Sequence, residues 1–224
     1  MKSFFLSLFI IFGVESFAQT QETTISNFNP SGKIYNKHTG EKISDREFGE
    51  FIRNNPRVSF EFIINKYGEV EKYLLDMTTR TSVKSSGSNQ VQPGEEFPEF
   101  VFNTVEGREL ASKDLLGNWI LVRFELTTNM VSKSSYLEFD QKISQSNNEV
   151  ELEVISCFKD SKTAINNFFD SSLTNIHLVA DAQNFNLKYD IIRWPTNVLI
   201  DPQGKVVKYF FRLDEIDLDS LNMN

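Results

Sequence analysis

Thiol and imidazole side chains, the groups best suited to nucleophilic attack, proton transfer near neutral pH and binding of soft metals, are few in this sequence. The chain contains one cysteine, Cys157, and two histidines, His38 and His177. One cysteine excludes a disulfide-stabilised scaffold and a Cys-rich zinc site, and two histidines exclude catalysis built on several imidazoles. A single thiol can still be oxidised to sulfenic acid or form a mixed disulfide. The alternative is that Cys157 is a small buried hydrophobic residue, as most free cysteines are.

The remaining titratable groups do not form a recognisable metal site. His38 stands in the polar turn 37–40 and is interpreted as a solvated loop residue, whereas His177 falls in a short expected strand and is interpreted as structural. The acidic C-terminal segment lacks the glycine and the closing glutamate of a calcium-binding loop, so we interpret it as a solvated terminus. Its carboxylates are Asp214, Glu215, Asp217 and Asp219. We therefore expect no metal ion and no cofactor.

The composition indicates a folded, acidic protein. Of 224 residues, 40% are hydrophobic, which is enough for a packed core, and 21 are phenylalanines. The chain has 23 Lys and Arg against 31 Asp and Glu, a formal net charge of −8. Because such a surface repels phosphate backbones, we expect no binding to nucleic acid.

The N-terminus has the pattern of a secretory signal peptide. Lys2 gives a positive start, the apolar run 4–14 follows, and the small residues Ser16 and Ala18 precede a cleavage point before Gln19. A membrane anchor or a buried helix is the alternative, but the run is too short to span a bilayer of about 30 Å. No cysteine follows it, so a lipid anchor is excluded. We expect residues 1–18 to be removed, no membrane span to remain, and export to the bacterial periplasm or cell envelope.

A polar Ser- and Thr-rich stretch, 78–90, divides the rest of the chain and is interpreted as a linker. Before it, residues 19–77 predict a small α+β region. Ser44 and Glu47 form a capping-box pattern for a helix that ends before Pro56. The next two expected strands form a hairpin and comprise residues 58–64 and 70–75. A hairpin with one helix is marginal in water, so this region is expected to lean on the second domain or on a partner.

Residues 91–224 alternate between expected strands and helices, which predicts an α/β domain with a mixed sheet. The strands are expected at 119–124, 150–158, 176–180, 197–200 and 205–211. The helices are expected at 132–147 and 162–169. The last two strands pair across the turn 201–204, which has proline early and glycine late.

Five short motifs punctuate this region in a fixed order. They are residues 93–100, 105–110, 114–118, 193–196 and 198–207. In this order they resemble the thioredoxin-like superfamily, closest to its exported TlpA/ResA-type and redoxin (AhpC/TSA-like) branch. The resemblance covers residues 91 to about 211. It implies a thioredoxin-like mixed sheet flanked by helices, preceded by the small α+β N-terminal region.

The resemblance also locates the family's chemistry, and the residues there are changed. The family carries a Cys-x-x-Cys pair just after the central strand, at the start of a helix. Aligned on Phe124, these two positions are Asn129 and Ser132, with Met130 and Val131 between them. An amide is no substitute for a thiolate, and a serine hydroxyl stays protonated without a base, so neither residue can exchange a disulfide. We expect thiol–disulfide activity to be lost and Ser132 to be a helix N-cap.

The part of the family's site that needs no sulfur is its peptide-binding surface. There, the residue before a cis-proline presents its backbone to an extended peptide, in the manner of an added strand. The resemblance places Trp194, Pro195, Thr196 and Met130 on this surface and implies a cis Trp194-Pro195 bond. Trp194 is either an anchor for the peptide or a residue that packs the loop. The expected partner is an extended peptide or an envelope protein.

Three functions remain open from the sequence. The first is a redox-inactive peptide- or protein-binding module that has lost the family's cysteines. The second is an atypical single-cysteine oxidoreductase or peroxidase that uses Cys157. The third is a scaffold in which the N-terminal region binds the partner and the second domain supports it.

Overall fold

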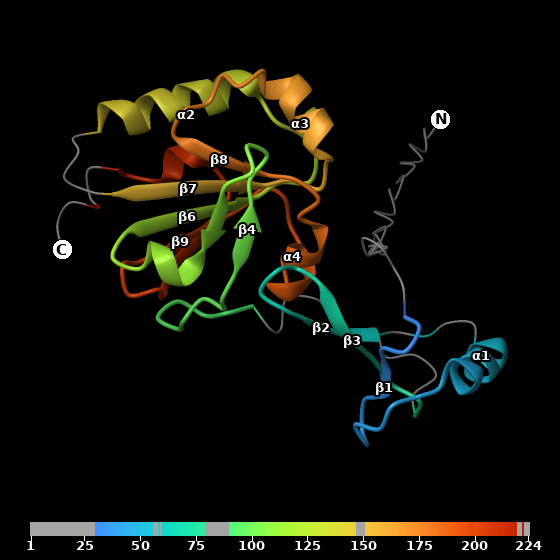
Figure 1. Ribbon diagram of the computed structural model, residues 1–224. Coiled ribbons are helices and arrows are strands. Elements are labelled where there is room, and N and C mark those ends of the chain that lie inside the picture. Colours follow the sequence, from blue (N-terminus) through green and yellow to red (C-terminus); the bar gives the residue numbers. More distant parts are fainter. Residues whose placement is uncertain are drawn as a thin grey trace, which may run out of the picture.

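The computed structural model describes residues 30–55, 58, 60–78, 90–146, 151–218 and 221 (Figure 1). They form a small N-terminal unit and a larger C-terminal α/β domain. The expected signal peptide, and all of the expected linker except its two end residues, lie outside the described residues. Within the described part of the chain, no helix has the length and apolar character needed to cross a membrane.

The N-terminal unit packs one helix against a three-stranded sheet. The helix, α1 (Asp45–Asn54), starts at Ser44 with the predicted capping box, in which Ser44 and Glu47 exchange side-chain and backbone hydrogen bonds. The sheet has the order β1-β3-β2, with strands β1 (Ile34–Asn36), β2 (Phe60–Ile64) and β3 (Val70–Leu75). The β2–β3 hairpin is the one that the sequence predicted. Strand β1, which pairs parallel with β3, was not predicted.

The C-terminal domain is built on a five-stranded mixed sheet of order β10-β9-β6-β7-β8. Its strands are β6 (Trp119–Phe124), β7 (Leu152–Cys157), β8 (Ile176–Val179), β9 (Thr196–Ile200) and β10 (Val206–Phe210). The first three run parallel. On the other side of β6, β9 pairs antiparallel with β6, and β10 pairs antiparallel with β9. This confirms the predicted thioredoxin-like α/β fold with its terminal hairpin.

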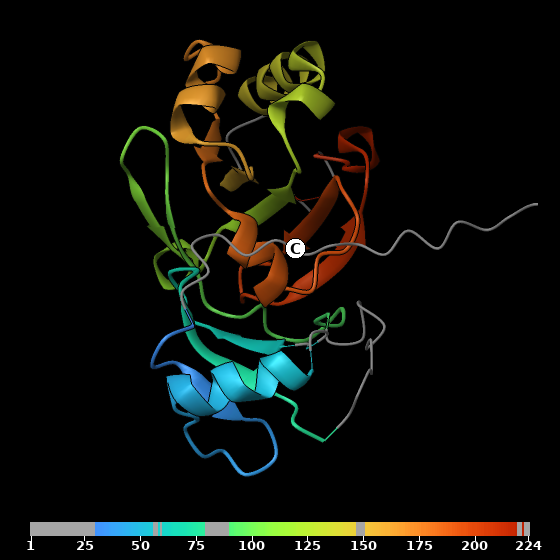
Figure 2. The same cartoon turned by 90° about the vertical axis from the view of Figure 1, so that its right-hand side faces the viewer.

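Helices cover both faces of the sheet (Figures 1 and 2). Helices α2 (Lys133–Gln145) and α3 (Lys162–Phe169) lie on one face. The other face carries α4 (Gln183–Lys188) and a short hairpin, β4 (Val101–Asn103) and β5 (Glu109–Ala111). Short 3₁₀ turns, η1 (Ser112–Leu115), η2 (Thr128–Met130) and η3 (Leu213–Glu215), complete the domain.

The two faces are separated by strict alternation along β6. Trp119 and Leu121 pack with α2 and α3, whereas Ile120, Val122 and Phe124 pack with α4 and the β4–β5 hairpin. Successive side chains of a strand point to opposite faces, and here both faces are buried, which explains the nearly continuous apolar run. The same alternation fixes which side chains near the end of β6 share a face.

The N-terminal unit contacts the larger domain through the turn between β2 and β3. The Val101 amide donates to the Lys66 carbonyl at 2.7 Å. Asn184 Nδ2 donates to the Gly68 carbonyl at 2.9 Å, and Lys188 Nζ donates to the Asn65 carbonyl at 3.1 Å. The unit therefore leans on the second domain, as expected for a hairpin and one helix.

Candidate functional site

The two residues that the resemblance aligns with the family's cysteine pair, Asn129 and Ser132, lie in the turn that connects β6 to α2. Asn129 lies in η2, and Ser132 is the N-cap of α2, with its Oγ accepting the Ser135 amide at 3.3 Å. This confirms the predicted capping role of Ser132. The Thr128 amide donates to the Asp160 carboxylate at 2.5 Å, so a side chain from the β7–α3 loop fixes the turn. The two aligned positions thus hold an amide and a capping hydroxyl.

A groove with a volume of about 410 Å³ lies beside this turn, which we name the α2 groove. Residues that line it include Arg123, Glu125, Met130, Ser132, Pro195 and Phe211. Met130 and Phe211 are large apolar side chains that are 68% and 46% exposed. Exposed apolar side chains at the border of a concave surface are typical of interaction sites.

The predicted binding residues divide between this groove and the core. Met130 and Pro195 line the groove, and the Trp194-Pro195 bond is cis, as the resemblance implied. Thr196 is buried in β9, and its Oγ1 donates to the Arg193 carbonyl at 2.8 Å. The Trp194 indole packs against the core cluster on the α4 face. For Trp194, the structure supports loop packing over a side-chain anchor.

A buried polar network forms the floor of the α2 groove. Arg123 and Glu125 are 8% and 2% exposed, and Arg123 Nε donates to Glu125 Oε1 at 2.5 Å. The Tyr136 hydroxyl donates to the same carboxylate oxygen at 3.1 Å, and Arg123 Nη1 donates to Asn197 Oδ1 at 2.9 Å. Burial raises the pKa of Glu125, although the Arg123 charge opposes the rise. Burial likewise raises the pKa of the Tyr136 hydroxyl.

This network was not predicted as part of a site, although the sequence contains a signal for it. Arg123 and Glu125 are charged residues at the end of an otherwise apolar strand, Trp119–Phe124. Charged residues are rarely buried unless they are paired. Asn197, which completes the network, is 74 residues away from Arg123 in sequence, and only the pairing of β6 with β9 brings the two together.

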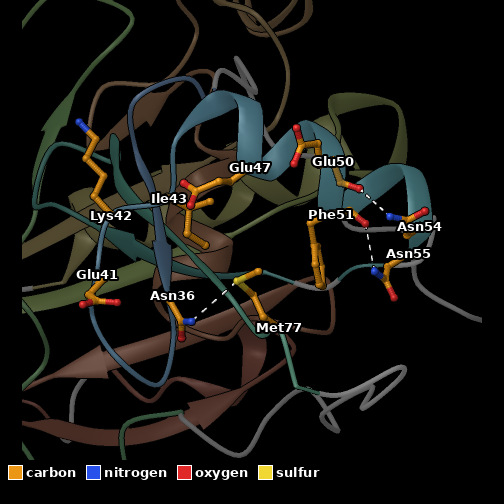
Figure 3. Close-up of a pocket in the computed structure, with 10 residues that line it drawn as sticks. All are labelled: Asn36, Glu41, Lys42, Ile43, Glu47, Glu50, Phe51, Asn54, Asn55 and Met77. Carbon is orange, nitrogen blue, oxygen red and sulfur yellow. Dashed lines mark hydrogen bonds between the residues drawn. The ribbon is translucent and has the colours of Figure 1, made fainter.

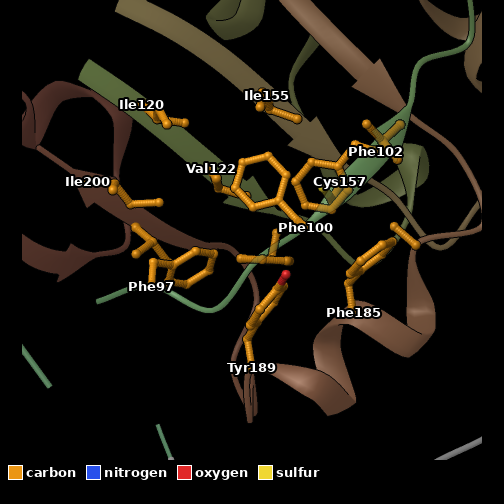
Figure 4. Packing of buried hydrophobic residues seen from close by; sticks show 14 of the residues in the cluster. Phe97, Phe100, Phe102, Ile120, Val122, Ile155, Cys157, Phe185, Tyr189 and Ile200 are labelled. Carbon is orange, nitrogen blue, oxygen red and sulfur yellow. The ribbon is translucent and has the colours of Figure 1, made fainter. Parts of the chain in front are cut away.

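Cys157 lies at the same edge of the sheet but on the opposite face from the groove. It pairs in register with Phe124, whereas Ser156 pairs with Arg123. Its side chain is 1% exposed and is enclosed by the aromatic cluster that includes Phe100 and Phe102 (Figure 4). Burial raises the pKa of the Cys157 thiol, which disfavours the reactive thiolate.

The histidines lie where the sequence suggested, away from the groove. His38 is half-exposed in a turn, with Nε2 at 3.1 Å from an Asp76 carboxylate oxygen. His177 is in β8, with Nε2 at 3.0 Å from a Glu153 carboxylate oxygen. Across the described ranges, no three His, Cys, Asp or Glu side chains are grouped in a way that would hold a metal ion.

A second pocket of about 410 Å³ lies in the N-terminal unit (Figure 3). It is lined by the apolar residues Ile43, Phe51 and Met77, together with polar side chains such as Asn36 and Asn55. Asn36 Nδ2 lies 3.7 Å from the Met77 sulfur, and Asn55 Nδ2 donates to the Phe51 carbonyl at 3.0 Å. This pocket contains polar groups, but neither Asn129 nor Ser132 lines it.

Solved structures similar to this chain include several thiol-handling proteins. A thiol-disulfide oxidoreductase from Bacteroides fragilis is 16% identical, with a TM-score of 0.46, over 53% of this chain and 91% of its own. A thiol peroxidase from Chromobacterium violaceum is 17% identical, with a TM-score of 0.45, over 56% of this chain and 83% of its own.

Comparison of sequences gives one curated relative and one family match. The thiol-disulfide oxidoreductase ResA of Bacillus subtilis is 29% identical over 125 residues, which are 55% of this chain and 69% of ResA. The sequence pattern of the AhpC/TSA family matches residues 93–209, slightly more than half of the chain. The match spans the strands and helices that form the five-stranded sheet and both of its covering layers. The chain therefore belongs to the AhpC/TSA family.

Proposed function

We propose that this protein is an exported, redox-inactive member of its family that binds an extended peptide segment of an envelope protein in the α2 groove. The observation that carries the proposal is the chemistry of the family's cysteine positions. Asn129 and Ser132 hold these positions, and the one thiol of the chain, Cys157, is buried on the other face of the sheet. The proposed location rests on the signal-peptide pattern of residues 1–18.

The geometry beside Pro195 supports binding of a peptide backbone. Among the described residues, neither the amide nor the carbonyl of Trp194 makes a hydrogen bond. An extended peptide can pair with such free backbone groups in the way that a strand joins a sheet. Met130 and Phe211 provide apolar surface for its side chains.

The alternative, a single-cysteine oxidoreductase or peroxidase, needs a thiolate that substrate can reach. Cys157 is 1% exposed, and its environment favours the protonated thiol, so the geometry supports this alternative less well. An insulin-reduction assay and a peroxide-reduction assay on the mature protein and on Cys157→Ser separate the two functions. We expect no turnover from either protein. Turnover that requires Cys157 would overturn the proposal.

Binding is tested with charged substitutions on the rim of the groove. Met130→Asp and Phe211→Asp should each weaken capture of envelope peptides at least tenfold, because both side chains are exposed and contribute apolar contact area. Leu116→Asp is the matched control, since Leu116 is 56% exposed but precedes β6, at the opposite end of that strand. Capture that is equal for all three variants would discard the α2 groove as the binding site.

A further inference from the structure

The floor of the α2 groove is an ion pair whose hydrogen-bonding capacity is only partly used. Arg123 binds through Nε and Nη1, and Glu125 accepts through Oε1. Among the described residues, Arg123 Nη2 and Glu125 Oε2 make no hydrogen bond. Two unused polar groups at the floor of a groove can form hydrogen bonds with water or with a ligand that displaces it, so they mark a place where a polar ligand group can bind.

Both unused atoms belong to residues that line the groove. The described chain has three fully enclosed side-chain atoms without a partner, namely Asn184 Oδ1, Asn186 Oδ1 and Trp194 Nε1. Arg123 Nη2 and Glu125 Oε2 are not among them, which fits atoms that border open space. The floor therefore offers one donor and one acceptor to a group that enters from the groove.

The charges around the groove favour a neutral ligand group. On the floor, the positive charge of Arg123 is balanced by Glu125 at 2.5 Å. On the rim, Arg212 and Asp214 are paired at 2.5 Å, and Lys142 and Glu138 add one charge of each sign. A carboxylate would be attracted by Arg123 but repelled by Glu125. An ammonium group would be attracted by Glu125 but repelled by Arg123. A neutral group that both donates and accepts can satisfy the two residues together.

We propose that the floor of the α2 groove recognises the side-chain carboxamide of a glutamine or asparagine in the bound peptide. The carboxamide NH₂ donates to Glu125 Oε2, and its carbonyl accepts from Arg123 Nη2. Met130, Pro195 and Phe211 line the same groove and offer apolar surface to the rest of the peptide, while the carboxamide side chain reaches the floor. This inference rests on the proposed function, because it specifies which peptide the groove selects.

The test uses an array of heptapeptides that are acetylated and amidated, so that their ends carry no charge. The central residue is Gln, Asn, Glu, Lys or Leu, and the flanking positions are randomised among Val, Thr and Ser. We expect peptides with central Gln or Asn to bind at least tenfold more tightly than those with Glu, Lys or Leu, because a mismatched group leaves a buried polar partner unpaired.

Glu125→Gln tests whether Glu125 contacts the peptide, because the loss of a residue with only a structural role would not change which central residue is preferred. It removes the negative charge from the floor and leaves Arg123 unbalanced, so the preference should shift from Gln peptides to Glu peptides. Glu138→Gln removes a carboxylate from the rim alone and should retain the Gln preference. Circular dichroism checks folding, and if Glu125→Gln does not fold, the preference of the wild-type protein decides the question.

The outcomes separate this inference from the proposed function. Binding that is independent of the central residue would overturn carboxamide recognition and leave the peptide-binding groove in place. Absence of binding by any peptide, with Met130→Asp giving the same background, would overturn both. If the wild-type protein preferred peptides with a central Glu or Lys, this result would also contradict recognition of a neutral carboxamide.

Discussion

The ring of Phe185 in α4 lies directly against Gly68, in the turn between β2 and β3. A Cβ atom at Gly68 would fall 2.7 Å from the Phe185 ring, closer than real Cβ contacts allow. Gly68 also has a φ of +77°, which side chains rarely adopt. The contact between the N-terminal unit and the α/β domain therefore depends on a glycine at this position.

Gly68→Ala should loosen the N-terminal unit from the domain. The Phe185 ring cannot move away easily, because it packs against Phe102 with ring centroids 4.6 Å apart. We expect a loss of about 1–3 kcal/mol in the free energy of unfolding beyond the cost of backbone strain, measured by urea denaturation. Limited proteolysis should cleave the N-terminal unit faster. Gly40→Ala is the matched control, since Gly40 has a φ of +74° but nothing within 4 Å. Equal losses for both variants would rule out the clash.

Cys157 should be unreactive in the folded protein. Its side chain is 1% exposed, and burial raises its pKa, so both access and thiolate formation are restricted. We expect a chromogenic disulfide reagent to label the folded protein at least 100-fold more slowly than the protein unfolded in guanidinium. Met130→Cys in a Cys157→Ser background is the positive control, because position 130 is 68% exposed. Rapid labelling of folded wild-type protein would contradict the burial of the thiol.

Asp140 should be a strong contributor to stability. Its carboxylate accepts the backbone amides of Thr174 and Asn175 at 3.1 and 2.7 Å and the Thr174 hydroxyl at 3.0 Å, and the residue is 7% exposed. Asp140→Ala leaves these donors without a partner, so we expect a loss of about 2–3 kcal/mol in urea denaturation. Lys133→Ala serves for comparison and should cost less than about 1 kcal/mol, because it removes only the surface ion pair with the exposed Asp170. A small effect at Asp140 would mean that water replaces its carboxylate.

Glu153 should make stability depend on acidity. The hydrogen bond with His177 holds the pKa of Glu153 below its usual range, although burial opposes this. The folded state then binds fewer protons than the unfolded state, in which the carboxyl has a pKa of about 4.3. Ionised Glu153 therefore contributes fully to the free energy of unfolding above that pH. This contribution is lost as the pH falls through the lower folded pKa.

The measurement compares wild type with Glu153→Gln in urea denaturation between pH 3 and pH 7. Since the pair is partly exposed, we expect the wild type to be more stable by less than about 1 kcal/mol at pH 7, with the difference vanishing at low pH. His177→Gln should remove most of the same pH dependence. A difference that grows as the pH falls would have the wrong sign and would contradict this assignment.

Much of the fold follows from local patterns in the sequence. The capping box at Ser44, the strand β6 and the helix α3 lie at their predicted positions, because capping residues and apolar periodicity act within a few neighbours. Strand β1 and helix α4 were not predicted. Both are short, three and six residues, and they are stabilised by partners far away in the chain rather than by their own pattern.

The site was predictable only in part. The absence of a Cys-x-x-Cys pair is readable from the sequence, because the chain has one cysteine, whereas the alignment of that pair with Asn129 and Ser132 stays a prediction. The sequence also placed Cys157 at the same edge of the sheet. It did not show that Cys157 and Arg123 point to opposite faces, which depends on the register between β6 and β7.

The sequence by itself determined that this chain has an α/β domain of a thiol-handling family without the family's thiol pair. Tertiary structure decided which side chains surround the turn between β6 and α2. It joined Arg123 to Asn197 across paired strands, enclosed Cys157 in aromatic side chains and packed the Trp194 indole against the core. The physical reason is that composition fixes which chemical groups exist, whereas strand register and packing between distant segments fix which groups meet and which of them a ligand can reach.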